Sequence, residues 1–161
     1  LRRLSSGYTV QEVASRPLCS ESRSTITHLT WWGVYANNIP EMDNFTLTVF
    51  RDNGSGMPEP GGFWAWTPFE AVNRTATSRF VEPGLRDLRI YEYSCEVEGW
   101  DLEPDTTYYL SIVNDTEFGI WMWCENGSSS EGNGFGVNRA TWARDWTANT
   151  VDMAFQLRSN R

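Results

Sequence analysis

Residues 45–50 read Phe45-Thr46-Leu47-Thr48-Val49-Phe50, so that apolar and polar side chains alternate. Because successive side chains of a β-strand point to opposite faces, Phe45, Leu47 and Val49 share one face and the two threonines share the other. Strands with one buried and one wet face are typical of antiparallel sheets. Residues 108–113 repeat this alternation. The sequence therefore predicts antiparallel β-structure at both places.

Short β-rich segments of this kind recur along the chain and are separated by turn-forming residues, as in an all-β protein. We expect eight strands, at 25–35, 44–51, 63–67, 72–81, 89–97, 107–113, 118–124 and 151–158. Residues 126–138 are rich in Gly, Ser and Asn and are predicted to form one long loop. The spacing favours a single antiparallel β-sandwich, jelly-roll-like, over residues 25–161, preceded by an arm or first strand at 1–24.

The composition excludes several classes of protein. The chain has 161 residues and a formal net charge of -8, and all its basic residues other than its one histidine are arginine. A polyanion such as DNA would be repelled by this charge, so we expect no nucleic-acid partner. No run approaches 18 consecutive apolar residues, so the sequence predicts no transmembrane segment. A hydrophobic content of 40% argues against a disordered chain.

Nine tryptophans give the strongest indication of function. The pairs Trp64/Trp66 and Trp121/Trp123 each place two indoles on one face of a strand, either in a core or on a platform for a ring-shaped ligand. Exposed indoles would stack on sugar rings. The predicted ligand-binding residues are Trp100, Trp142, Trp146, Trp64, Trp66, Arg139 and Arg144, because Trp142 and Trp146 lie four residues apart beside the two arginines and the predicted loop.

The loop Asp52-Asn53-Gly54-Ser55-Gly56 offers three side-chain oxygens within four residues. Calcium takes six to eight oxygen ligands from flexible turns, so Asp52, Asn53 and Ser55 together with Asp43 are a candidate structural Ca²⁺ site. The same residues also fit an ordinary polar hairpin turn.

Three cysteines make an odd count. In an oxidising compartment we expect one disulfide and one remaining thiol. Cys95–Cys124 is the preferred pairing and Cys19–Cys95 is the alternative. Five N-x-[ST] triplets, at Asn44, Asn53, Asn73, Asn114 and Asn126, are compatible with an extracellular location.

No catalytic motif stands out. His28 is the one histidine, and no serine lies in a Gly-x-Ser-x-Gly elbow that a Ser-His-Asp triad on an α/β-hydrolase fold would need. Glu92, Glu96 and Glu98 fall at even spacing on one strand, which suits a solvated acidic face as well as a pair of glycosidase carboxylates. We therefore expect the protein not to be an enzyme.

A longer pattern resembles a known group of proteins. The pattern consists of Thr25-Ile26-Thr27-His28-Leu29-Thr30-Trp31-Trp32-Gly33-Val34-Tyr35, then 43–50, the loop 52–58, Thr107-Tyr108-Tyr109-Leu110-Ser111-Ile112, Trp121-Met122-Trp123 and 152–157. This order resembles the secreted bacterial β-sandwich modules of surface-sorted proteins of the PEP-CTERM type and similar planctomycete proteins. The resemblance covers about Thr25 to Leu157, and it implies an extracellular, non-catalytic module.

Two functions follow as hypotheses. The first is an extracellular or cell-surface module that binds a polysaccharide or glycan surface through exposed tryptophans. The second is a structural subunit of an extracellular fibre, appendage or surface layer, in which self-assembly would bury the aromatic side chains, since Trp and Tyr are also enriched at interfaces.

Overall fold

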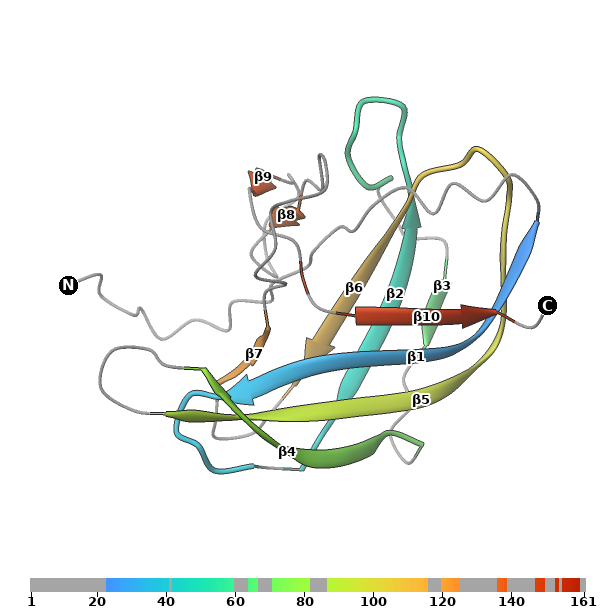
Figure 1. Ribbon diagram of the computed structural model, residues 1–161. Helices are drawn as coiled ribbons and strands as arrows, with labels where there is room; N and C mark the ends of the chain where they lie inside the picture. Colours follow the sequence, from blue (N-terminus) through green and yellow to red (C-terminus); the bar gives the residue numbers. More distant parts are fainter. Residues whose placement is uncertain are drawn as a thin grey trace.

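The computed structural model describes residues 23–40, 42–59, 64–66, 71–81, 87–115, 120–124, 136–138, 147–149, 153 and 155–159, with the backbone alone at 64–66, 136–138 and 147–149. The regular structure of these residues is entirely β, in strands β1 to β10 (Figure 1). Every described strand pairing is antiparallel. The prediction of an antiparallel all-β fold is therefore confirmed.

The strands form two larger sheets and one small one. The first sheet has the order β10-β1-β5-β4, with β7 also paired to β1, and the second has the order β3-β2-β6. The first sheet contains β1 (Ser24–Tyr35), β4 (Asn73–Val81), β5 (Leu88–Leu102), β7 (Trp121–Trp123) and β10 (Phe155–Ser159). The second contains β2 (Phe45–Arg51), β3 (Trp64–Trp66) and β6 (Tyr108–Asn114), and β8 (Gly136–Asn138) pairs with β9 (Thr147–Asn149).

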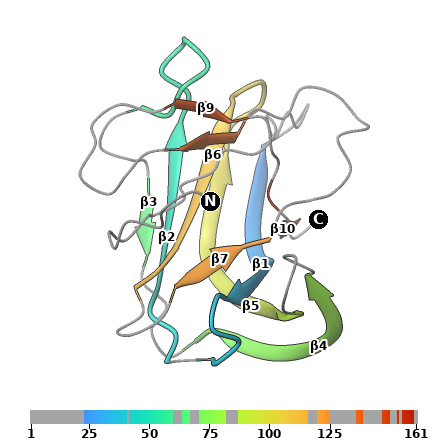
Figure 2. The same cartoon turned by 90° about the vertical axis from the view of Figure 1, so that its left-hand side faces the viewer.

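The two larger sheets share one hydrophobic core, and Figure 2 shows β2 and β3 to one side of it and β1 and β5 to the other. The Trp31 ring of the first sheet meets the Phe45 ring of the second edge-on at 5.1 Å and stacks on Tyr93 at 5.6 Å. The alternation read from residues 45–50 explains the contact, because Phe45, Leu47 and Val49 all face this core. In Figure 1 the strands of the two sheets cross steeply.

A bulge in β5 changes which residues face the core. Ile26 of β1 lies opposite Trp100, whereas His28, two residues on, lies opposite Glu96. The two extra residues of β5 are accommodated at Gly99, whose φ of 50° suits a residue without a Cβ. Before the bulge Val97 faces the core, and after it Trp100 faces the core as well.

The predicted strands agree closely with β1 to β7 and β10, whereas β9 has no predicted counterpart. Two further differences concern β5 and the predicted loop. β5 runs on to Leu102 because the bulge lets pairing with β1 continue beyond Val97. The prediction of one loop over 126–138 is wrong at its end, where 136–138 form β8. Most of the predicted arm lies outside the described residues, and β1 begins at Ser24. The finer prediction of a jelly-roll-like sandwich stays a prediction.

Candidate functional site

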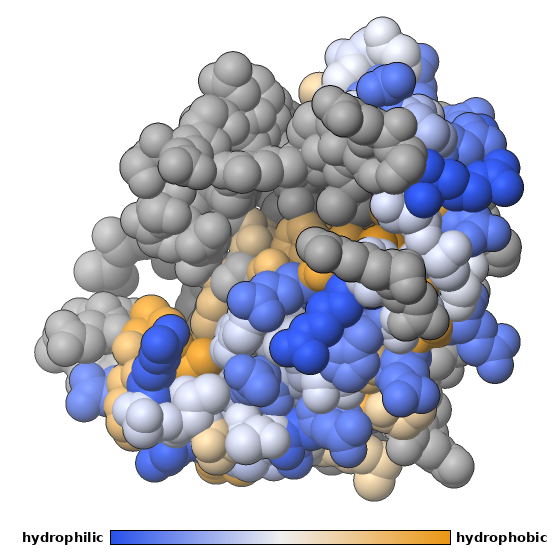
Figure 3. Space-filling model, turned by 45° about the vertical axis from the view of Figure 1, so that its right-hand side comes forward, coloured by the Kyte–Doolittle hydropathy of each residue, from blue (hydrophilic) through white to orange (hydrophobic). Residues whose placement is uncertain are grey.

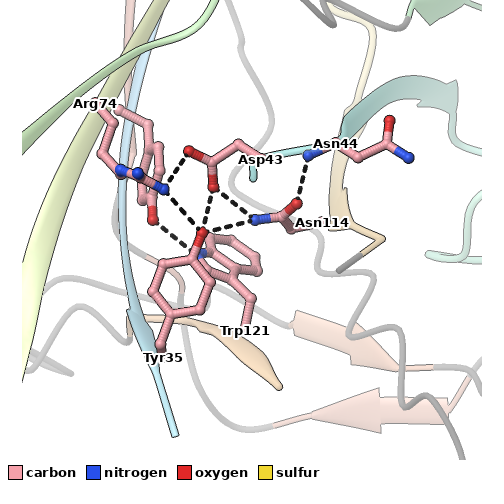
Figure 4. Close-up of polar contacts among 7 residues, drawn as sticks. Tyr35, Asp43, Asn44, Arg74, Asn114 and Trp121 are labelled. Atoms are coloured by element: carbon pink, nitrogen blue, oxygen red, sulfur yellow. Dashed lines mark hydrogen bonds and ion pairs between the residues drawn. The ribbon is translucent and has the colours of Figure 1, made fainter. Parts of the chain in front are cut away.

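A polar cluster ties the two larger sheets together at the end of β1 (Figure 4). The cluster consists of Tyr35 of β1, Asp43 just before β2, Arg74 of β4 and Asn114 at the end of β6. Arg74 Nη1 lies 2.7 Å from Asp43 Oδ2, while Asp43 Oδ1 accepts hydrogen bonds from the Tyr35 hydroxyl and, at 2.9 Å, from Asn114 Nδ2. The side-chain oxygen of Asn114, Oδ1, in turn accepts a hydrogen bond from the backbone N–H of Asn44 at 2.8 Å. We call these four side chains the inter-sheet cluster.

Burial and the charge of Asp43 fix the protonation of this cluster. The pKa of Tyr35 is raised to about 12, mainly by burial and secondly by the hydrogen bond to Asp43. Burial likewise raises the pKa of Tyr93, whose hydroxyl accepts the Trp121 indole N–H at 3.3 Å. Burial by itself would lower the pKa of Arg74. The charge of Asp43 and the contacts of Arg74 with Tyr35 and Tyr93 outweigh this effect, so the pKa of Arg74 is raised overall. The phenol groups of Tyr35 and Tyr93 therefore stay protonated at neutral pH. The inter-sheet cluster links the two sheets through hydrogen bonds and an ion pair.

A second arrangement lies on the outer side of the first sheet. Leu29 and Trp31 face the core, so their neighbours Thr30 and Trp32 point outward. Trp32 is partly exposed, and its indole N–H donates to Glu92 Oε2 at 3.1 Å across β1 and β5. Cross-strand partners on this face form the rows Trp32–Glu92–Thr75, Gln156–Thr30–Ser94–Asn73 and Arg158–His28–Glu96.

Beyond Trp32, in the direction of the β1 C-terminus, the same face becomes apolar. Val34, Leu88 and Cys124 are buried there, and Trp32, Ile90 and Met122 pack against them while remaining partly exposed. Figure 3 shows hydrophilic residues over much of the described part of this side, with hydrophobic ones at its left-hand end and in a band above them. We call the six side chains the outer apolar group. Trp32 thus stands at the border between an apolar and a polar half of one sheet face.

The predicted sugar-binding indoles lie elsewhere or outside the described residues. Trp100 is only 4% exposed and belongs to the core, so the prediction that it is exposed is wrong; the bulge at Gly99 turns it inward. Trp64 and Trp66 form β3, of which the backbone alone is described. Trp142, Trp146, Arg139 and Arg144 lie outside the described residues.

Trp32 was missed as a site residue, although the sequence contains the signal. Two adjacent tryptophans in one strand point to opposite faces, so if Trp31 fills the core, Trp32 must lie on the outer face. Among the five indoles whose side chains the structure describes, Trp31, Trp100 and Trp123 are buried, and Trp121 packs edge-on against Phe45 in the core. Trp32 alone of these five faces outward.

The proposed calcium ligands are not brought together. Asp43 and Asp52 lie at opposite ends of β2, and Asp43 belongs to the inter-sheet cluster. Asp52 accepts the Tyr109 hydroxyl at 2.6 Å and the backbone N–H of Gly54, and Asn53 Oδ1 accepts the N–H and the hydroxyl of Ser55. The loop oxygens are thus used to close the turn. Within the described part of the chain no three His, Cys, Asp or Glu side chains gather as metal ligands.

The preferred disulfide is contradicted by the geometry. Cys95 faces the core opposite Leu29, whereas Cys124 belongs to the outer apolar group, with its N–H bonded to the Trp32 carbonyl at 2.9 Å. Neither of these two buried cysteines forms a disulfide, and they lie on opposite faces of one sheet. A disulfide requires Cβ atoms that approach each other, which these positions do not provide. Cys19 of the alternative pairing lies outside the described residues.

Comparisons with known proteins returned no matching family model, no similar curated protein and no similar solved structure. The resemblance to secreted bacterial modules therefore stays a prediction. In the described residues, no helix is long and apolar enough to cross a membrane.

Proposed function

We propose that this protein is a non-catalytic extracellular β-sandwich module that binds carbohydrate on the outer side of the first sheet, around Trp32. The observation that carries the proposal is the outward-facing indole of Trp32, held by Glu92 within a row of polar side chains. The acidic, lysine-free composition and the N-x-[ST] triplets support the extracellular location.

The Trp32–Glu92 hydrogen bond prepares the indole for stacking. It satisfies the polar N–H and restrains the ring, so little side-chain freedom is lost when a sugar ring is bound. The axial C–H groups of a sugar ring suit the face of an indole. Contact with one indole contributes on the order of 1–3 kcal/mol, which is enough for weak binding to one sugar and for avid binding to a repeating polymer.

Hydrogen-bonding groups surround the indole at suitable spacing. Thr75 lies on the far side of Glu92 in the same row, and Ser94 and Gln156 flank the buried Thr30 in the next row, about 7 Å along the strands. Hydroxyl, amide and carboxylate groups in this arrangement can accept from and donate to sugar hydroxyls. Rigid strands hold them, so the face is preorganised.

Isothermal titration calorimetry with a panel of soluble glycans tests the proposal. We expect at least one glycan to bind, and we expect Trp32→Ala to weaken that binding at least about tenfold. Thr75→Ala changes an exposed hydroxyl and should weaken binding severalfold without altering the thermal unfolding midpoint. Thr48→Ala on the outer side of the second sheet is the matched control and should bind like the unaltered protein. Binding that is unchanged in both Trp32→Ala and Thr75→Ala would overturn the assignment of the face.

A second candidate function, a subunit of an extracellular assembly, is favoured by one observation. The described large apolar side chains with the highest exposure are Ile39 (62%), Met42 (78%), Phe80 (45%), Val81 (38%) and Ile120 (56%). Four of them, Ile39, Phe80, Val81 and Ile120, lie on segments that meet at one end of the first sheet. There the Ala36 N–H donates to the Ile120 carbonyl, the Arg89 N–H donates to Asn38 Oδ1, and Val81 pairs with Leu88. Exposed apolar side chains gathered in this way are typical of interaction sites.

Sedimentation velocity distinguishes this candidate from the first. A subunit should form larger species as concentration rises, and Ile39→Asp combined with Ile120→Asp should abolish them. A protein that stays monomeric at all accessible concentrations would exclude self-assembly through this end and leave the binding module.

A further inference from the structure

We propose that the glycan bound on the outer face is a neutral one whose sugars carry acetamido groups, with the sugar ring on Trp32 and the acetamido methyl group on the outer apolar group. This inference rests on the proposed carbohydrate-binding function and names the class of sugar. Its basis is the change from polar to apolar side chains within one sheet face, with Trp32 at the border.

The apolar half of the face is unusual for its position. The outer side of an antiparallel sheet is commonly polar, yet here Val34 and Leu88 are only 4% and 5% exposed and form an apolar floor. Ile90 and Met122 lie beside this floor and keep part of their surface exposed. A ligand that covers Trp32 and extends toward the β1 C-terminus would place its next group against Ile90 and Met122. A hydroxyl group there would lose water without gaining a partner, whereas a methyl group would gain apolar contact.

The acetamido group also matches the polar side of the border. Its amide N–H is a donor, and the Glu92 carboxylate is acceptor-only when ionised. Glu92 Oε2 already accepts the Trp32 indole N–H, and Oε1 receives no hydrogen bond from the described residues. Thr75, opposite Glu92 on β4, offers a hydroxyl that can donate to the amide carbonyl. The methyl group of one acetamido substituent would therefore contact the outer apolar group, while its amide would hydrogen-bond Glu92 and Thr75.

Charge selects a neutral sugar over an acidic one. Glu92 and Glu96 both point outward from β5, and the chain as a whole carries a formal charge of -8. A uronic acid or a sulfated sugar placed on Trp32 would bring a second negative charge close to Glu92. Arg158, a cationic group of this face, belongs to the row Arg158–His28–Glu96, on the far side of Thr30 from Trp32. An acetamido sugar carries no charge and avoids this repulsion.

Calorimetry with two soluble oligosaccharides of equal length tests the inference, one built from N-acetylglucosamine and one from glucose with the same linkage. We expect the acetamido oligomer to bind about tenfold more tightly, as one buried methyl group and one hydrogen bond would give. A uronic-acid oligomer should bind more weakly than either. In the Glu92→Gln variant, the affinity for the uronic-acid oligomer should come closer to that for the neutral oligomers.

The variant Ile90→Thr probes the methyl contact directly. It replaces an apolar side chain of the outer face by a β-branched polar one and should reduce the preference for the acetamido oligomer to about threefold or less. Val113→Thr, a partly exposed position on the outer side of β6, is the matched control and should leave the preference unchanged.

Three results separate the claims. Equal binding of both neutral oligomers, lost in Trp32→Ala, overturns the acetamido inference and leaves the carbohydrate-binding function standing. A preference that survives Ile90→Thr overturns the role of the outer apolar group. Binding of no glycan in the panel overturns the proposed function and the inference together.

Discussion

Arg74 and Asp43 join the two larger sheets through an ion pair whose closest atoms, Nη1 and Oδ2, are 2.7 Å apart. Arg74 comes from the edge strand β4 of the first sheet, and Asp43 precedes β2 of the second. The Arg74 guanidinium also lies over the Tyr91 ring, 5.7 Å from its centre. The charged pair, together with Tyr35 and Asn114, thus links the two sheets beside their shared hydrophobic core.

Removing the charge of Asp43 should destabilise the fold. Asp43→Asn leaves Arg74 partly buried without its anionic partner, so we expect the free energy of unfolding to fall by about 1–3 kcal/mol in urea denaturation. Glu103→Gln is the control, because the Arg51–Glu103 pair is more exposed, at 35% and 48% of the two side chains. That change should cost less than about 1 kcal/mol. Equal losses in the two variants would contradict the role of the inter-sheet cluster.

Stability should fall in alkaline solution. The Tyr35 pKa is raised to about 12 in the folded protein, against about 10 in an unfolded chain, so the folded protein binds more protons between these values. The stabilisation is fully present below pH of about 10 and is lost as pH rises toward 12. Urea denaturation at stepped pH should show this decline.

The control for the alkaline decline is Tyr35→Phe, which should make the slope shallower. It should not remove the slope, because burial also raises the pKa values of Tyr93 and Cys95. A slope that is the same with and without the Tyr35 hydroxyl would exclude Tyr35 as a contributor.

The two described cysteines should remain thiols. Burial raises the pKa of Cys95 to about 12, so little thiolate is present at neutral pH and alkylation of the native protein should be slow. Peptide mapping without reduction should recover Cys95 and Cys124 unlinked. Unfolding in denaturant should make both react rapidly, which controls for the reagent. A Cys95–Cys124 cross-linked peptide would contradict the arrangement of β5 and β7.

Gly33 should tolerate no side chain. A Cβ at this position would overlap the Trp121 indole, which lies directly over the glycine. We expect Gly33→Ala to destabilise the protein by about 1–3 kcal/mol, measured by urea denaturation. The double variant Gly33→Ala/Trp121→Phe should lose less than the sum of the two single changes, because the smaller ring makes room. If the loss of stability in the double variant equals the sum of the two single losses, the overlap between the new Cβ and the Trp121 ring is not the cause of the destabilisation.

The sequence predicts the strands well and the long-range contacts poorly, for identifiable reasons. Alternation places Leu47 and Val49 in the core because it depends only on neighbouring residues. The burial of Trp100 depends on a two-residue bulge at Gly99, which alternation does not reveal. The partners Asp43 and Arg74 are separated by 31 residues, so only the folded sheets bring them together.

The most direct test of the central claim is the indole N–H region of a ¹H–¹⁵N correlation spectrum, recorded with and without the glycan that binds best. Trp32→Phe assigns the Trp32 resonance by its disappearance. The account predicts that the Trp32 resonance shifts progressively on titration, while those of the buried Trp31 and Trp100 stay in place. A glycan that binds without moving the Trp32 resonance would contradict the account.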